Sequence, residues 1–121
     1  MPRFIIKVSP DRDAYVEWST VVDAPVSVGN RAAYAAEHGE DRLRRTDEAG
    51  TSARFFDWLP PEEQEGGWAD PVLVCTSRGG FPAALPRVRL GGVFDLIMAD
   101  PGAHIPDHWL TKWKDVEPQW R

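Results

Sequence analysis

Apolar and polar residues alternate near the start of the chain in a pattern that predicts an opening β-hairpin. Residues 4–8 and 15–22 are rich in β-branched and aromatic side chains, and the intervening residues 9–13 have the composition of a turn. Because side chains alternate between the two faces of a strand, one face of the second strand is expected to point at the core. That face consists of Val16, Trp18, Thr20 and Val22. Trp18 is therefore predicted to be a core residue.

Residues 31–48 form a polar, alanine-rich stretch that predicts the main helix. Asn30 is placed to cap the first turn, and Gly50 lies just past the last one. The apolar face is thin and consists of Ala32, Ala36 and Leu43, with Tyr34 to one side. A glycine inside a helix costs roughly 1 kcal/mol relative to alanine, so Gly39 is a point at which this helix could split in two.

The second half of the chain alternates short apolar runs with helix breakers. Residues 51–58 predict a short strand, residues 59–67 a solvated loop, and residues 72–76 a buried strand. Gly91-Gly92 separates two further apolar runs, which is the pattern of a second hairpin with a two-residue turn. A helix over residues 93–99 stays open as an alternative, although the β-branched content and the glycines favour a strand.

Residues 107–114 predict a short C-terminal helix that follows Pro106 and carries Trp109 and Trp113 on one face. Together the elements predict an α+β fold, in which a mainly antiparallel sheet of about five strands packs with the main helix and this short one. A chain of 121 residues fits a single domain over residues 1–121, and we find no repeat or interdomain linker in it.

Composition narrows the class of protein. The 14 basic and 19 acidic residues give a net charge of −5, which argues against direct binding to nucleic acid. No apolar run approaches the ~20 residues of a membrane span, and the apolar start, interrupted at Lys7, is too short for a signal peptide. We therefore expect a cytoplasmic protein. The single Cys75 lies in an apolar run and predicts a buried, inert thiol.

Two segments of the first half, YVEWSTVVDAPV at residues 15–26 and RLRRTDEAGTS at residues 42–52, resemble small uncharacterised proteins of actinobacteria and their phages. The resemblance implies a setting, which is the cytoplasm or, for a phage-encoded protein, the host cytoplasm. It implies no activity and transfers no site residue.

A possible metal site lies near the C-terminus. His104, Asp107 and His108, with Asp100 close by, have the density of ligands typical of a zinc or manganese site. Pro106 lies between the two histidines and opposes the continuous helix that this spacing requires. The alternative is a surface loop in which Asp107 caps the following helix. The corresponding functional hypothesis is a small metal-dependent hydrolase or nuclease; apart from it, the sequence predicts no cofactor, and it contains no nucleophile elbow or phosphate loop.

Tryptophan is the most unusual feature of the composition, with 6 residues in this short chain. Two of them bracket an acidic segment, and between residues 55 and 77 there are five carboxylates and no basic side chain. The candidate partner-binding residues are Trp58, Glu62, Glu63, Glu65, Trp68, Trp109, Trp113 and Trp120.

These residues predict a non-catalytic protein-interaction module. Interfaces favour tryptophan because one rigid ring desolvates a large area, and acidic residues around it steer a basic partner. A regulator, an inhibitor or an assembly component would use such a surface. The alternative is that the indoles only cover the edges of a small sheet and that the acidic run is simply solvated.

Overall fold

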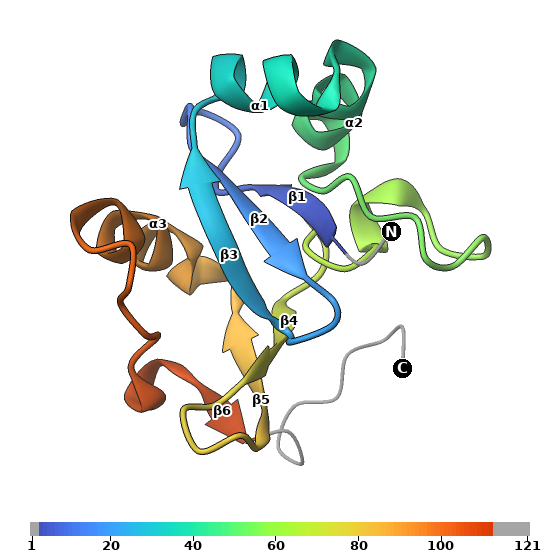
Figure 1. The fold of residues 1–121 in the computed structure, drawn as a ribbon. Helices are drawn as coiled ribbons and strands as arrows, with labels where there is room; N and C mark the ends of the chain where they lie inside the picture. Colours follow the sequence, from blue (N-terminus) through green and yellow to red (C-terminus); the bar gives the residue numbers. More distant parts are fainter. Residues whose placement is uncertain (1–2, 113–121) are drawn as a thin grey trace.

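Residues 3–112 are described by the computed structural model, which contains two small antiparallel sheets (Figure 1). The first sheet has the order β1-β2-β3 and the second the order β4-β5-β6. The strands of the first sheet are β1 (Arg3–Lys7), β2 (Tyr15–Ser19) and β3 (Ala24–Gly29). Those of the second are β4 (Val72–Thr76), β5 (Pro82–Pro86) and β6 (Thr111–Lys112). The α+β class is confirmed, whereas the single five-stranded sheet is wrong, because β4 pairs with β5 instead of extending the first sheet.

Within residues 3–112, three helices accompany the sheets. They are α1 (Arg31–His38), α2 (Glu40–Ala49) and α3 (Leu90–Ala99), joined by the short 3-10 turns η1 (Pro61–Glu63), η2 (Arg87–Arg89) and η3 (Asp107–Trp109). In Figure 1, α1 and α2 lie together at one end of the first sheet, and α3 lies beside β3, away from α1 and α2. No helix within residues 3–112 has the length and apolar character needed to span a membrane.

The main helix of the prediction is split as Gly39 suggested. Asn30 Oδ1 accepts a hydrogen bond from Ala33 N at 2.9 Å and so caps α1. Gly39 has φ +94° between the two helices, and Gly50 ends α2 in the left-handed conformation with φ +88°. Both glycines occupy backbone conformations that other residues adopt only with strain.

The predicted second hairpin is wrong, because residues 87–99 form η2 and α3. The apolar residues follow a helical spacing: Leu90 and Val93 are fully buried, and Phe94 and Ile97 pack against the same core cluster. Gly92 makes no turn. It allows the Trp109 ring to approach so closely that a Cβ there would lie 3.0 Å from it.

Three further expectations are corrected. Residues 51–58 contain only one bridge, between Thr51 and Ile6, because the chain after it turns into an irregular loop. In place of the predicted C-terminal helix, residues 107–112 form the turn η3 followed by β6. The end of the predicted helix, residues 113 and 114, lies outside the described residues. Val22 is 53% exposed instead of buried, since β2 ends at Ser19.

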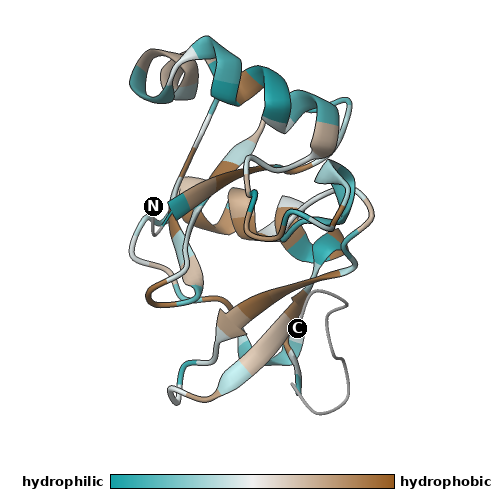
Figure 2. Ribbon diagram, turned by 90° about the vertical axis from the view of Figure 1, so that its right-hand side faces the viewer, coloured by the Kyte–Doolittle hydropathy of each residue, from teal (hydrophilic) through white to brown (hydrophobic). Residues whose placement is uncertain are grey.

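The main core lies between the two sheets and α3. Trp18 is fully buried there, as predicted, and its Nε1 donates to the carbonyl of Val74 at 3.2 Å, which links β2 to β4. Cys75 is also buried, and burial raises the pKa of its thiol to about 12, so it is inert at neutral pH. A smaller cluster of Ile5, Tyr15, Tyr34 and Leu43 packs the other face of the first sheet against α1 and α2. Figure 2 shows hydrophobic strands inside and mostly hydrophilic α1 and α2 outside.

Arg87 joins the two halves of the fold from the end of β5. Its Nη1 and Nη2 donate to the carbonyls of Val8 and Lys7 at 3.0 and 2.6 Å, just after β1 and at its end. Its Nε donates to the carbonyls of Gly66 and Gly67 at 3.1 and 3.0 Å. Burial lowers the pKa of Arg87 to about 10, so the guanidinium stays charged at neutral pH and depends on these acceptors.

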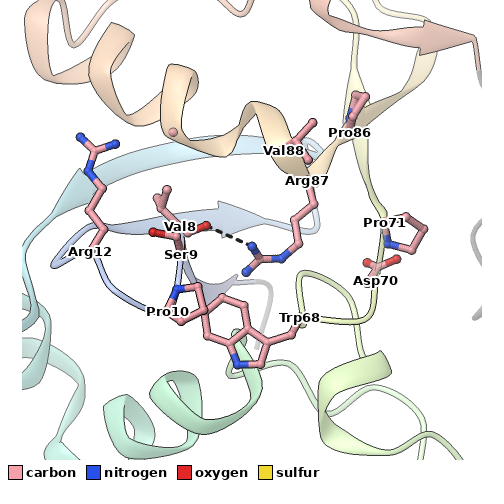
Figure 3. Close-up of a pocket in the computed structure, with 11 residues that line it drawn as sticks. Val8, Ser9, Pro10, Arg12, Trp68, Asp70, Pro71, Pro86, Arg87 and Val88 are labelled. Atoms are coloured by element: carbon pink, nitrogen blue, oxygen red, sulfur yellow. Dashed lines mark hydrogen bonds between the residues drawn. The ribbon is translucent and has the colours of Figure 1, made fainter.

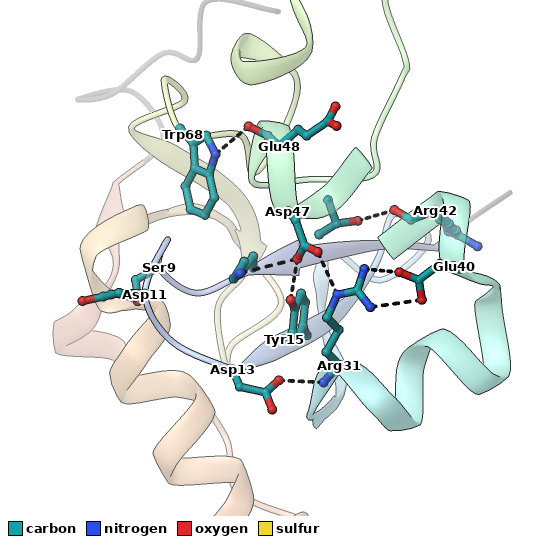
Figure 4. A network of polar contacts seen from close by, with 12 residues as sticks. Ser9, Asp11, Asp13, Tyr15, Arg31, Glu40, Arg42, Asp47, Glu48 and Trp68 are labelled. Carbon is teal, nitrogen blue, oxygen red and sulfur yellow. Dashed lines mark hydrogen bonds and ion pairs between the residues drawn. The ribbon is translucent and has the colours of Figure 1, made fainter. Parts of the chain in front are cut away.

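Asp47 joins α2 to the first sheet (Figure 4). Its carboxylate accepts hydrogen bonds from the Tyr15 hydroxyl, from Lys7 Nζ at 3.4 Å and from Arg31 Nε at 2.7 Å. Arg31 also forms a two-point contact with Glu40. Burial acts to raise the pKa of Asp47, but the hydrogen bonds and the nearby cations outweigh burial and lower it.

We expect Arg87→Met to destabilise the protein by about 3 kcal/mol or more, because four carbonyls lose a charged donor. The measurement is the free energy of unfolding in urea at neutral pH. Arg78→Met is the control, since the Arg78 side chain is exposed, and its effect should stay within about 0.5 kcal/mol. Equal stabilities of the two variants would contradict the role of Arg87.

We expect Asp47→Asn to lower the free energy of unfolding by about 1–3 kcal/mol at pH 7. Since the folded pKa of Asp47 lies below its ordinary value, the stabilisation is complete above that value and is lost as the pH falls through the folded pKa. The difference between the two proteins should therefore shrink in acid. Urea titrations at several pH values measure this difference in the free energy of unfolding, and the exposed Asp57→Asn is the control. A difference that does not change with pH would show that the Asp47 carboxylate does not stabilise the fold through its charge.

Candidate functional site

Residues 55–58 (Phe55, Phe56, Asp57, Trp58), here called the aromatic loop, place aromatic side chains at the surface. Trp58 is 72% exposed and Phe55 is 42% exposed. The Trp58 ring lies against the Phe56 ring with centroids 4.6 Å apart. The Phe55 ring packs at nearly a right angle to the ring of the buried Phe4, with centroids 5.5 Å apart. The exposed indole is thus supported by a neighbouring ring, and the loop is anchored to the core.

Gln64 fixes the shape of this loop from inside. Its side chain is buried, and its Oε1 accepts from the backbone N–H groups of Phe55 and Phe56 at 3.1 and 3.2 Å. Its Nε2 donates to the carbonyls of Phe56 and Leu59. A buried amide that makes four hydrogen bonds holds the backbone around it in one arrangement. The aromatic loop is therefore preorganised.

The acidic residues beside the aromatic loop divide into two sets. Asp57 and Glu62 are exposed and Glu63 is half-buried, and within residues 3–112 none of the three forms an ion pair. Glu65 and Asp70 are instead buried, at 5% and 3% exposure. The expectation of a wholly solvated acidic loop is therefore wrong. The segment folds back on the core through Gly66 and Gly67, and its surface charge is smaller than the sequence suggests.

Trp68 does not point freely into solvent. Its Nε1 donates to the carbonyl of Glu48 at 2.9 Å, and the Arg87 guanidinium lies over its ring at 4.6 Å. Its ring also covers Gly50, where a Cβ would meet it at 2.7 Å. The Trp68 indole therefore packs against Arg87, and part of the ring surface stays accessible to solvent.

That surface belongs to an open groove of about 740 Å³ (Figure 3). Its walls are mostly apolar, and the apolar residues are Val8, Pro10, Trp68, Pro71, Pro86 and Val88. The ionisable groups in the groove already have partners: Arg12 pairs with Asp95 at 2.6 Å, Asp70 Oδ2 accepts from Gly66 N, and Arg87 donates to carbonyls. The groove therefore offers an apolar surface and no group free for acid–base chemistry.

Trp109 covers the edge of the main core. It packs against that cluster and over Gly92, and Arg89 lies 5.7 Å from its ring centroid. This indole has a structural role, and partner binding by Trp109 stays a prediction. Trp113 and Trp120 lie outside the described residues. Of the predicted partner-binding residues, Trp58 and Glu62 are exposed and Glu63 is half-buried, and all three lie within residues 58–63.

The structure does not gather the predicted metal ligands. His104 and His108 are both exposed, and His108 lies edge-on to Trp109 at 6.3 Å. Asp107 Oδ1 accepts from the backbone of Arg78 at 3.4 Å. Within residues 3–112, the one group of three His, Cys, Asp or Glu side chains near enough to share an ion is Glu17, Glu37 and His38, which lies elsewhere in the fold.

Comparison of the chain with protein-family models, with curated proteins and with solved structures gives no match. Phe55, Phe56 and Gln64 belong to the candidate site but were not among the residues predicted from the sequence. The run Phe-Phe-Asp-Trp was a visible signal for the first two, whereas Gln64 carries no local signal, because its role depends on the backbone that folds around it.

We expect Gln64→Ala to loosen the aromatic loop and to cost about 1–3 kcal/mol of stability, because buried backbone groups lose their partners. Hydrogen exchange of the Phe55 and Phe56 amides, measured by NMR, should accelerate, while exchange in β2 changes much less. Glu62→Gln in the neighbouring turn η1 serves as control and should leave the exchange unchanged. Unaltered protection of both amides in Gln64→Ala would show that another contact fixes the loop.

Proposed function

We propose that this chain is a non-catalytic protein-interaction module that binds a partner with a basic surface through the aromatic loop, Glu62 and Glu63. The observation that carries the proposal is the position of Trp58, which is 72% exposed although its loop is held by the four hydrogen bonds of Gln64. A large apolar ring in a fixed, exposed position has the properties of an interface anchor.

Both kinds of side chain contribute to such binding. An indole that is already fixed loses little conformational entropy when a partner covers it, so more of its burial free energy appears as affinity. The carboxylates of Asp57, Glu62 and Glu63 lack ion-pair partners within residues 3–112 and would attract Lys and Arg side chains. Attraction of this kind raises the association rate most strongly at low salt.

The setting is part of the same proposal. The resemblance of the first half to actinobacterial and phage proteins supports a regulator, an inhibitor or an assembly component that acts in the cytoplasm or in the host cytoplasm. The net charge of −5 supports a protein partner over a nucleic acid.

The test begins with affinity capture from the cells that carry the gene, and the captured protein is then purified for binding measurements. We expect Trp58→Ala to weaken its affinity by roughly 30-fold, as for an interface hot spot. The double variant Glu62→Lys, Glu63→Lys should slow association and remove most of its salt dependence, and the double Gln variant should have an intermediate effect.

Phe81→Ala is the matched control, because Phe81 is an aromatic residue with the same 72% exposure outside the aromatic loop. It should bind like the unaltered protein. The proposal is overturned if Phe81→Ala and Trp58→Ala weaken binding equally, or if the charge reversals leave the association rate and its salt dependence unchanged.

A further inference from the structure

Glu17 carries a carboxylate that is buried under α1. The residue lies on β2, and its side chain is only 8% exposed. Its Oε1 accepts a hydrogen bond from Ser27 Oγ at 3.2 Å, and Arg3 Nη1 lies 3.9 Å from the same oxygen. Removing a carboxylate from water is costly unless a cation or several donors compensate it. Its contacts here are few and long for such a position.

His38 faces this carboxylate from the last position of α1. Its Nε2 lies 3.6 Å from Glu17 Oε2 and 3.8 Å from Glu37 Oε1. The Nε2 atom is inaccessible to solvent and makes no hydrogen bond to any of the described residues 3–112. A buried ring nitrogen that lies near two carboxylates but makes no hydrogen bond to either is unfavourable as it stands.

We propose that Glu17, Glu37 and His38 form a binding site for a divalent transition metal of the zinc class. The three ligand atoms lie within 4.8 Å of one another. Ligands bound to one zinc ion at about 2.0–2.2 Å stand roughly 3.3–3.5 Å apart in tetrahedral geometry, so small side-chain movements complete the site.

The chemistry of the site follows from its ligands. One imidazole and two carboxylates suit zinc better than magnesium, which binds oxygen ligands almost exclusively. Three protein ligands leave a fourth position open. Glu37 is 64% exposed and forms the solvent side of the group, so that position is accessible to water or to an anionic ligand.

The contact between Arg42 on α2 and His38 disfavours metal binding. Its Nη1 lies 3.5 Å from His38 Nδ1, and since a guanidinium only donates, this contact favours the tautomer with the proton on Nε2. Metal binding needs the lone pair of Nε2 and moves the proton to Nδ1. Uptake of an ion therefore breaks the contact with Arg42, and an acceptor at residue 42 would orient the ring for the metal instead.

The test is titration of the untagged full chain with Zn²⁺ in competition with a chromophoric chelator. We expect one ion per chain. Glu37→Gln and His38→Gln should each weaken binding at least about tenfold, while Arg42→Glu should tighten it about tenfold. Glu37 is exposed, so its replacement is expected to preserve the fold, and thermal unfolding without metal verifies this for every variant.

The double variant His104→Gln, His108→Gln is the control and should bind Zn²⁺ like the unaltered chain. The proposal is overturned if the unaltered chain binds no more tightly than His38→Gln. It is also overturned if the control loses the ion, or if Arg42→Glu binds more weakly than the unaltered chain.

Discussion

The half-buried guanidinium of Arg87 is the contact on which the arrangement of the two sheets depends. All three of its nitrogens donate to backbone carbonyls, two at the end of β1 and two in the turn at Gly66 and Gly67. A charge that is partly withdrawn from water needs partners for its donors, so these contacts restrict the relative positions of the three segments. Gln64, which shapes the aromatic loop, lies just before that turn. Arg87 therefore holds the turn that follows the residue which shapes the aromatic loop.

Patterns that depend on local backbone chemistry were predictable. Asn30, Gly39 and Gly50 mark the ends of α1 and α2 because each performs its role through neighbouring residues of the chain. The Gly91-Gly92 pair led to a wrong prediction, since Gly92 allows Trp109 to approach α3, a contact that no local pattern contains. Strand β5 was missed because it begins and ends with proline, at Pro82 and Pro86.

In the candidate site, too, some features were predictable from the sequence and others depend on tertiary contacts. Exposure of Trp58 was expected, because it was predicted to contact a partner, and the residue is 72% exposed. Burial of Glu65 could not be read from its acidic neighbours, since it results from the way the segment folds back through Gly66 and Gly67. Glu17 and His38 belong to different elements, and only the packing of α1 on the first sheet brings them together. The periodicity of apolar residues predicts which face of one element is buried. It does not predict which side chains of different elements come together in the tertiary structure.

The contacts of Arg87 also have a consequence for the order in which the chain folds. Its carbonyl acceptors at Lys7 and Val8 precede it by 80 and 79 residues. During synthesis on the ribosome, the opening strands emerge long before their charged partner and cannot complete these contacts. The contacts that join the two halves of the fold therefore form late, because they require the long intervening stretch of chain to be ordered.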